Sequence, residues 1–492
     1  MQMTQVASVI ASAYGINDPT PANNLLVLWG DSRTNSSTFE GGLVTTRMMQ
    51  TSGYAPWLLA ATGYRVEIIG NYSVPGQDLW FNRDQLTSLP GAGSSVYRGN
   101  LLSASAGGTL TDDAGINPGP TTAGGILFLA GVNGVNGARL NYTAGNASRW
   151  EDQAPNQLGT KPFFDQMFSA FDGAEKIYFV ANEMPNGDLS GGQGTVAHLE
   201  RRQKLDAYPA ISNKMVKVNT WDVMSSAPGA NSMKPGYADF DGIHTSVRGS
   251  YALAVDGWAP TINRVYRSFP VRNQLPTAQQ QATWLTSELF SSGTVAMTNV
   301  NGAVLAGGMT GSRSANAGLT VDCSRGTGPD GFPELVFRVY GTGTAAAGTI
   351  HELKVSKLLN CGSAASPLHP NSVTTSDGDR IFTIARMAVD AGNVGFMGCG
   401  AKTFIGCGFT DGSANANIQG SGAENGFFNY SGDLGGVAFD YAFMSQPAGI
   451  PSKWSSVGTS RLITGGLSVY YRADRAIDFT VRIGRFGIVK NR

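Results

Sequence analysis

The chain of 492 residues carries little charge. Charged residues make up 14% of it, and 35 Lys and Arg residues balance 35 Asp and Glu residues. Nucleic acids and anionic membrane surfaces bind proteins that present a basic field, which a chain of zero net charge does not supply. We therefore expect neither a nucleic acid nor a membrane as a partner.

Long apolar runs are missing as well. No stretch approaches the roughly 20 uninterrupted apolar residues of a transmembrane helix. The first 24 residues have neither the basic start nor the apolar core of a secretory signal. If the protein is extracellular, it reaches that place by another route, such as a virion, or its signal has been removed.

Cysteine and histidine are scarce. The four cysteines lack the C-x-x-C spacing of zinc sites, and both disulfides and buried free thiols fit their positions, Cys323, Cys361, Cys399 and Cys407. We expect no metal and no cofactor. A general base must come from a short list of histidines, His198, His244, His351 and His369.

Glycine, in contrast, is abundant: 65 residues are glycine, nearly twice the usual share of about 7%. The first half alternates strand-like and helix-like segments, which predicts a parallel α/β sheet covered by helices, a three-layer fold. Its expected strands are residues 25–29, 65–69, 126–130, 176–180 and 215–218, and its expected helices are residues 45–62, 163–171, 196–208 and the segment from 245.

The second half contains short strand-like runs separated by Gly, Ser, Asn and Asp turns, which predicts an antiparallel all-β sandwich or jelly roll. The predicted runs are residues 295–297, 319–321, 334–340, 350–355, 381–389, 436–444, 467–471 and 477–483. We divide the chain into an N-terminal segment 1–23, which includes a short helix, an α/β domain 24–268, a linker 269–290 with a second short helix, and a β-domain 291–492. Residues 77–125 form a connection of unusual length, which either shapes a substrate cleft or is a disordered insertion.

The first expected strand ends at Gly30-Asp31-Ser32. A serine just past a buried strand places its hydroxyl at the carboxyl edge of the sheet, where open α/β sheets carry their active sites. The alternative is a serine that caps a helix. A nucleophilic serine also needs a general base.

Asp241-Gly242-Ile243-His244 supplies the best candidate for that base. A carboxylate three residues before a histidine can point at imidazole Nδ1 and fix the tautomer. The alternative is a helix-capping aspartate beside an incidental histidine. Donors for an oxyanion are available after the next two strands, as the Gly76 N–H and the Asn133 amide.

Together, Gly30-Asp31-Ser32, Gly76, Asn133 and Asp241-x-x-His244 resemble the four sequence blocks of the SGNH (GDSL-type) hydrolases over residues 24–265. The resemblance implies Ser32 as nucleophile, His244 as general acid and base and Asp241 as its orienting carboxylate. It also implies an oxyanion hole made by the Ser32 N–H, Gly76 and Asn133. One departure is Gly134, where the third block often has aspartate. Arg33, beside the nucleophile, either contacts substrate or pairs with a carboxylate.

Residues 326–331 and the last strand are similar to jelly-roll modules of the carbohydrate-binding type, as attached to esterases in phage tail proteins and polysaccharide-degrading bacteria. We therefore expect a serine esterase that removes O-acetyl groups from a polysaccharide, works outside the cell or on a virion, and forms a homo-oligomer, a trimer in a phage tail. The alternatives are a lipase or thioesterase of the same family, and a non-catalytic glycan-binding adhesin or tail-fibre protein.

Overall fold

The fold comes from a computed structural model of the whole chain. It describes residues 18–35, 38–40, 46–50, 53–71, 123–130, 176–185, 202–208, 213–275, 309–314, 318–360, 379–408, 414–422, 432–450 and 462–490, with short pieces near residues 75, 165 and 300. The predicted N-terminal helix, the helix in the linker and nearly all of the connection 77–125 lie outside these residues. The three predicted boundaries between the four parts of the chain remain predictions.

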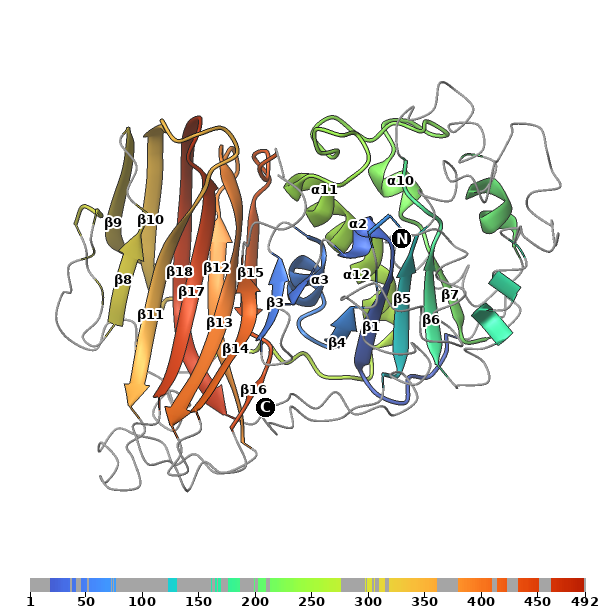
Figure 1. Cartoon of the computed structure of the whole chain (residues 1–492), viewed down its shortest axis with the longest axis horizontal. Helices are drawn as coiled ribbons and strands as arrows, with labels where there is room; N and C mark the ends of the chain where they lie inside the picture. The colour runs from blue at the N-terminus through green and yellow to red at the C-terminus, as the bar shows by residue number, and fades with distance from the viewer. Residues whose placement is uncertain are drawn as a thin grey trace.

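A five-stranded parallel sheet forms the first half, in the order β4-β1-β5-β6-β7 (Figure 1). Its strands are β1 (Leu25–Gly30), β4 (Glu67–Asn71), β5 (Gly125–Leu129), β6 (Ile177–Ala181) and β7 (Met215–Val218). Every residue of β1, β5 and β6 is buried, which is why their sequences read as continuous apolar runs. All five predicted strands of this sheet are present, with ends that differ from the prediction by at most two residues.

Helical segments cover both faces of the parallel sheet. On one face, Leu26 and Leu28 of β1 pack with α3 (Ala55–Ala61) and with the continuous helical run α11 (Val247–Ala252), η1 (Leu253–Trp258) and α12 (Ala259–Val265). On the other face, Val27 and Trp29 pack with side chains of the helical segments near residues 165 and 205. The predicted three-layer α/β fold is therefore confirmed.

The described residues of the second half form β-strands and turns, and the strands pair mostly antiparallel, as predicted. One sheet has the order β15-β12-β18-β10-β9, with β16 beside β12, and the other has the order β2-β3-β14-β13-β17-β11-β8. Strands β2 (Thr38–Glu40) and β3 (Thr46–Gln50) come from the first half of the chain. The strands from the second half are β8 (Met309–Arg313), β9 (Leu319–Thr327), β10 (Pro333–Thr342), β11 (Ile350–Asn360), β12 (Arg380–Val389), β13 (Phe396–Gly408), β14 (Ala414–Gly422), β15 (Phe439–Met444), β16 (Ala448–Gly449), β17 (Leu462–Arg472) and β18 (Ala476–Lys490). The sequence did not predict β8, β13, β14 and the two-residue β16, and each of the first three contains glycine, which is depleted in strands.

The prediction of one helical segment over residues 45–62 is wrong in its first part. Residues Thr46–Gln50 form β3, which pairs with β2 (Thr38–Glu40) and lies parallel to β14 of the second half. Only the part from Ala55 is helical. The edge of the sandwich offers five register pairs to this segment, and such a tertiary partner overrides local helix propensity.

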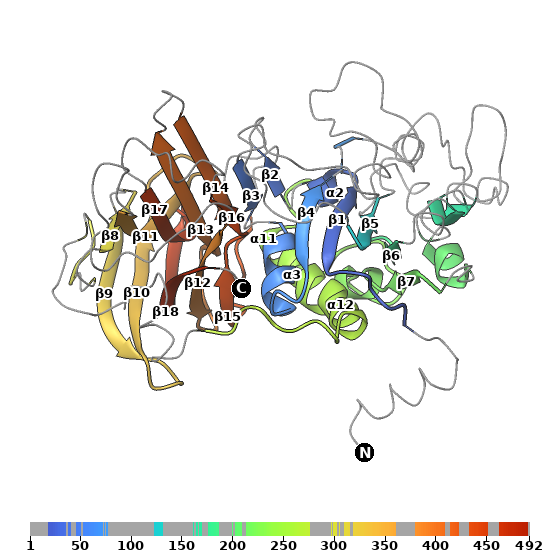
Figure 2. The same cartoon turned by 90° about the horizontal axis from the view of Figure 1, so that it is seen from below.

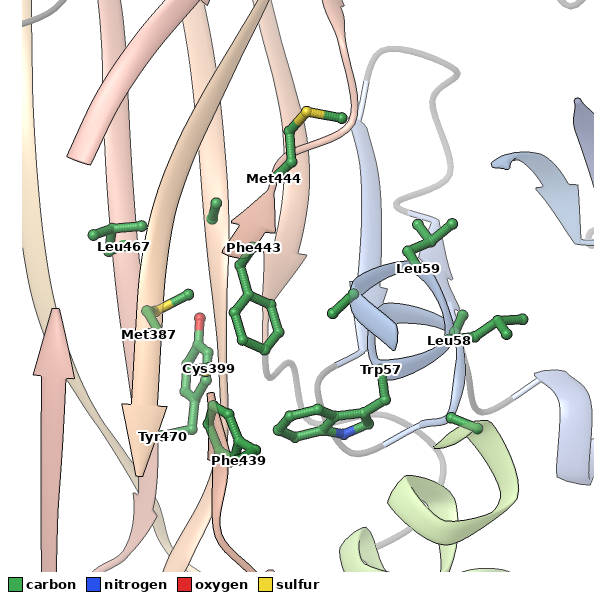
Figure 3. Close-up of a cluster of buried hydrophobic side chains, with 14 of the residues drawn as sticks. Trp57, Leu58, Leu59, Met387, Cys399, Phe439, Phe443, Met444, Leu467 and Tyr470 are labelled. Carbon is green, nitrogen blue, oxygen red and sulfur yellow. The ribbon is translucent and has the colours of Figure 1, made fainter. Parts of the chain in front are cut away.

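The two halves share one hydrophobic core and lie side by side in both views (Figures 1 and 2). Trp57 of α3 packs edge-on against Phe439 and Phe443 of β15, with ring centroids 5.1 and 5.7 Å apart (Figure 3). Its ring also lies 5.2 Å from that of Tyr251 in α11. The sandwich is therefore packed onto the helical layer that covers the parallel sheet.

Within the described ranges, no helix is long and apolar enough to cross a membrane. Cys399 is a buried free thiol on β13, and burial raises its pKa well above the ordinary value.

Candidate active site

Ser32 is the first residue of the short helix α2 (Ser32–Asn35), which follows β1 at the carboxyl edge of the sheet. The turn sits directly on the end of β5. A Cβ on Gly30 would lie 2.0 Å from the Leu129 carbonyl oxygen, and the Thr34 hydroxyl donates to the same oxygen at 3.1 Å. Only glycine permits this approach, so the close packing explains the first residue of the Gly-Asp-Ser motif.

The Ser32 hydroxyl, the His244 imidazole and the Asp241 carboxylate are hydrogen-bonded in series. Ser32 Oγ lies 2.8 Å from His244 Nε2, and His244 Nδ1 is hydrogen-bonded to Asp241 Oδ2. Ser32 is 5% exposed and His244 is 8% exposed. With the Nδ1 proton directed to the carboxylate, Nε2 accepts the serine proton, so the arrangement has the geometry of an activated nucleophile.

The loop from Asp241 to His244 is held by the same carboxylate. Asp241 Oδ1 accepts the backbone N–H groups of Ile243 at 2.9 Å and His244 at 3.0 Å. Burial by itself would raise the pKa of Asp241, but the hydrogen bonds from His244 and from the Ile243 N–H hold that pKa below its ordinary value. Asp241 therefore stays ionised at neutral pH.

The alternative interpretation of Asp241 as a helix cap does not describe this loop. Helix α11 is capped by Ser246, whose hydroxyl accepts the Gly249 N–H at 3.1 Å. The loop reaches that cap through a turn at Gly242, where φ is +71°.

Of the two residues predicted to donate to the oxyanion beside Ser32, the structure describes Gly76. Gly76 lies in a left-handed turn after β4, with φ +75°, and nothing would stand within 4 Å of a Cβ there. Asn133 lies outside the described residues. At the end of β4, Asn71 donates to the Thr34 carbonyl at 3.3 Å and accepts the Ser73 N–H at 3.0 Å. The β4 end is thus fastened to the serine turn, while the roles of Gly76 and Asn133 stay predictions.

For Arg33, sequence reasoning left both a substrate contact and a pairing with a carboxylate open, and the structure shows contacts of a third kind. Its side chain is buried and donates to three backbone carbonyls, those of Ile243, Met184 and Pro185. The sequence gives no signal for this role, because all three acceptors are backbone atoms more than 150 residues away.

Of the other histidines, the structure describes His351 alone. His351 lies on β11 of the sandwich, where its ring stands edge-on to Tyr471 at 6.1 Å. His198 and His369 fall outside the described residues. Within the described part of the chain, no group of three or more His, Cys, Asp or Glu side chains is placed to hold a metal ion.

No family model matches the sequence, and no curated protein matches it. Solved structures similar to the chain include a GDSL-like lipase from Bacteroides thetaiotaomicron, with 12% identity over 52% of this chain and 97% of that chain and a TM-score of 0.29. A mutant of an acetyl-xylooligosaccharide esterase from Geobacillus has 12% identity over 51% and 96%, with a TM-score of 0.31. A carbohydrate-binding module of the β-sandwich superfamily has 14% identity over 37% and 57%, with a TM-score of 0.20. Likenesses of this size do not define the activity of the chain.

Proposed function

We propose that the protein is a serine ester hydrolase that removes O-acetyl groups from a polysaccharide. The observation that carries the ester hydrolase is the hydrogen-bonded series of Ser32, His244 and Asp241 at the carboxyl edge of the parallel sheet. A merely structural serine has no need of an imidazole whose other nitrogen is bound to an ionised carboxylate.

The reaction runs in two halves. His244 Nε2 takes the proton of Ser32 as Oγ attacks the acetyl carbonyl carbon, and the oxyanion receives hydrogen bonds from the Ser32 N–H, the Gly76 N–H and the Asn133 amide. When the ester C–O bond breaks, His244 returns that proton to the sugar oxygen, which leaves as an alcohol. In the second half, His244 deprotonates a water molecule that attacks the acetyl-enzyme, and acetate and free Ser32 result. Asp241 stays ionised throughout and stabilises the imidazolium.

A cavity on the outer face of the β15-β12-β18-β10-β9 sheet supports the carbohydrate part of the proposal. It has a volume of about 610 Å³ and is lined by two arginines and three carboxylates, Arg386, Arg482, Glu334, Asp390 and Asp440. Each arginine is already paired with carboxylates of the cavity, Arg386 with Glu334 and Asp440, and Arg482 with Glu334 and Asp390. Fixed arrays of donors and acceptors suit hydroxyl groups, which both donate and accept, better than an anion that would meet three carboxylates.

The first test is hydrolysis of p-nitrophenyl acetate by the wild type and by Ser32→Ala. We expect the wild type to release p-nitrophenol and the variant to lose at least about 10³-fold in rate. Ser226→Ala is the matched control, because this exposed serine is hydrogen-bonded only at the surface, to Ser232. A wild type as inert as Ser32→Ala would leave the non-catalytic binding protein as the better explanation.

Comparison of acetate release from acetylated xylan with hydrolysis of a long-chain ester and of a thioester separates the polysaccharide esterase from the lipase and the thioesterase.

The second test concerns the cavity. We expect Asp440→Ala to weaken binding and deacetylation of an acetylated polysaccharide, while hydrolysis of p-nitrophenyl acetate is unchanged. Asp478→Ala is the control, because this carboxylate is equally exposed and pairs with Arg338 on the same sheet outside the cavity. Equal affinity of all three proteins for the polysaccharide would remove the cavity from the proposal.

Three further parts of the proposal rest on the resemblance found in the sequence analysis. The enzyme acts outside the cell or on a virion, its substrate is an acetylated polysaccharide, and it assembles as a homo-oligomer, a trimer in a phage tail. Acetate release from a panel of acetylated glycans tests the substrate, and the mass of the particle in solution tests the oligomeric state.

A further inference from the structure

Arg33 is a buried cation directly beside the proposed nucleophile. Its exposed fraction is 2%, and its own backbone N–H donates to Asp31 Oδ1 at 3.0 Å within the serine turn. A buried guanidinium loses its hydration and needs acceptors inside the protein. The acceptors it uses reveal what it holds together.

The guanidinium joins three segments of the chain. Nε donates to the Ile243 carbonyl at 3.0 Å, Nη1 to the Met184 carbonyl at 3.2 Å and Nη2 to the Pro185 carbonyl at 3.2 Å. Ile243 belongs to the histidine loop, and Met184 and Pro185 follow the end of β6. The planar, forked guanidinium can direct three N–H groups to three separate oxygens, whereas a lysine ammonium on its flexible stem is a single point charge.

These contacts close a ring that includes the proposed catalytic pair. Arg33 is the covalent neighbour of Ser32, and Ile243 is the covalent neighbour of His244. One hydrogen bond joins Arg33 to Ile243 and another joins His244 Nε2 to Ser32 Oγ at 2.8 Å. The ring therefore has two non-covalent links, the Arg33–Ile243 hydrogen bond and the Ser32–His244 hydrogen bond.

The segment after β6 contains a strained backbone turn, which the Arg33 hydrogen bonds stabilise. Glu183 is buried and has a left-handed backbone, with φ +74°, which is strained for a residue that has a side chain. Its carbonyl accepts a hydrogen bond from the Thr220 hydroxyl, and the next two carbonyls accept from Arg33. The strained turn is therefore held from both sides.

We propose that Arg33 is a positioning residue that sets the distance between Ser32 and His244 by fastening the histidine loop and the segment after β6 to the serine turn. This inference rests on the proposed serine esterase activity. Arg33 does not contact substrate, because its side chain is buried and its donors face backbone carbonyls.

The experiment uses the full chain with Arg33→Met and Arg33→Lys. Two rates are measured: the phosphonylation of Ser32 by a fluorophosphonate, which requires the activated serine and no polysaccharide, and the hydrolysis of p-nitrophenyl acetate, resolved into kcat and KM. A displacement of about 1 Å between reacting groups costs about 10²-fold in rate. We therefore expect Arg33→Met to lower kcat and the phosphonylation rate in parallel by about 10²-fold, with KM within about threefold, and Arg33→Lys to recover part of both rates.

Arg472→Met is the matched control, because Arg472 is also a buried guanidinium but lies on β17 of the sandwich, bound to Asp474 and outside the cavity. It should lower the thermal midpoint while leaving the phosphonylation rate unchanged. Should Arg33→Met fail to fold, Arg33→Lys decides, with an expected loss of at least about fivefold in kcat.

The two failures are distinguishable. A wild-type protein that is not phosphonylated at Ser32 overturns the proposed function. A wild type that is phosphonylated, together with a folded Arg33 variant that reacts at the wild-type rate, overturns the positioning role alone.

Discussion

At the scale of the residue, the motif Gly30-Asp31-Ser32 is explained by packing as much as by chemistry. Gly30 lies against the backbone of β5, buried Asp31 accepts the Arg33 N–H, and Ser32 Oγ meets the imidazole of His244. Each position therefore has its own physical requirement, and substitutions at the three positions should fail in different ways.

Gly30→Ala should destabilise the protein by about 1–3 kcal/mol, because its Cβ would overlap the Leu129 carbonyl oxygen and backbone atoms cannot move aside as flexible side chains do. Chemical denaturation with urea measures the loss. Gly257→Ala is the control: a Cβ there meets its nearest neighbour at an ordinary 3.5 Å inside a helical segment. Equal stability of Gly30→Ala and the wild type would show that the contact is not tight.

Asp241→Asn should lower kcat at neutral pH by about 10³–10⁴-fold, since an amide in place of the carboxylate favours the wrong imidazole tautomer. Esterase rates of the purified variant check this. Asp256→Asn is the control. It removes an exposed carboxylate on η1, the helical segment that continues α11, and should be as active as the wild type.

The pH dependence of stability gives a second signature of Asp241. Because folding lowers its pKa, its contribution to the free energy of unfolding is present above the unfolded pKa of about 3.9 and is lost as the pH falls through the lower folded pKa. The stability difference between wild type and Asp241→Asn should therefore shrink as the pH falls below about 4. A difference that grows on acidification would contradict the assignment.

At the scale of the element, α3 connects the two halves. Its apolar face packs on the parallel sheet, and its Trp57 inserts between β15 and the helix that follows the histidine loop (Figure 3). The preceding strand, β3, extends a sheet of the sandwich. The two consecutive elements β3 and α3 thus contact both halves.

Trp57→Ala should cost about 3–5 kcal/mol, because the side chain is 1% exposed and its removal leaves a cavity among Phe439, Phe443 and Tyr251. Trp57→Phe keeps an aromatic ring in the same place and should cost clearly less. The free energies of unfolding of the two variants test this order, and a reversal of it would show that the ring packing is not what stabilises the junction.

At the scale of the whole molecule, polar contacts reinforce the shared core. Glu67 at the start of β4 pairs with Arg272 at 3.1 Å and with Arg380 of the sandwich at 2.8 Å. The buried Tyr64 hydroxyl accepts the Met444 N–H at 2.8 Å. A junction built from apolar and polar contacts of this kind couples the unfolding of the two halves.

We therefore expect a single cooperative transition in calorimetry, with equal calorimetric and van't Hoff enthalpies, in spite of the length of the chain. Glu67→Gln should lower the midpoint and keep one transition. Two separate transitions in the wild type would show that the halves unfold independently.

The sequence by itself determined the parallel sheet, most strands of the sandwich and the residues Ser32, Asp241 and His244 as a candidate site. The strands follow from local signals, which are continuous apolar runs, alternation and turn residues. The candidate site follows from the serine turn, from the spacing of a carboxylate and a histidine on one loop, and from the resemblance of the four sequence blocks to a known family. The tertiary structure alone decided that residues 46–50 form a strand, that Trp57 joins the two halves and that Arg33 fastens the histidine loop. Those outcomes depend on partners 150 to nearly 400 residues away, and no local pattern records the energy of a contact that exists only after the chain has folded.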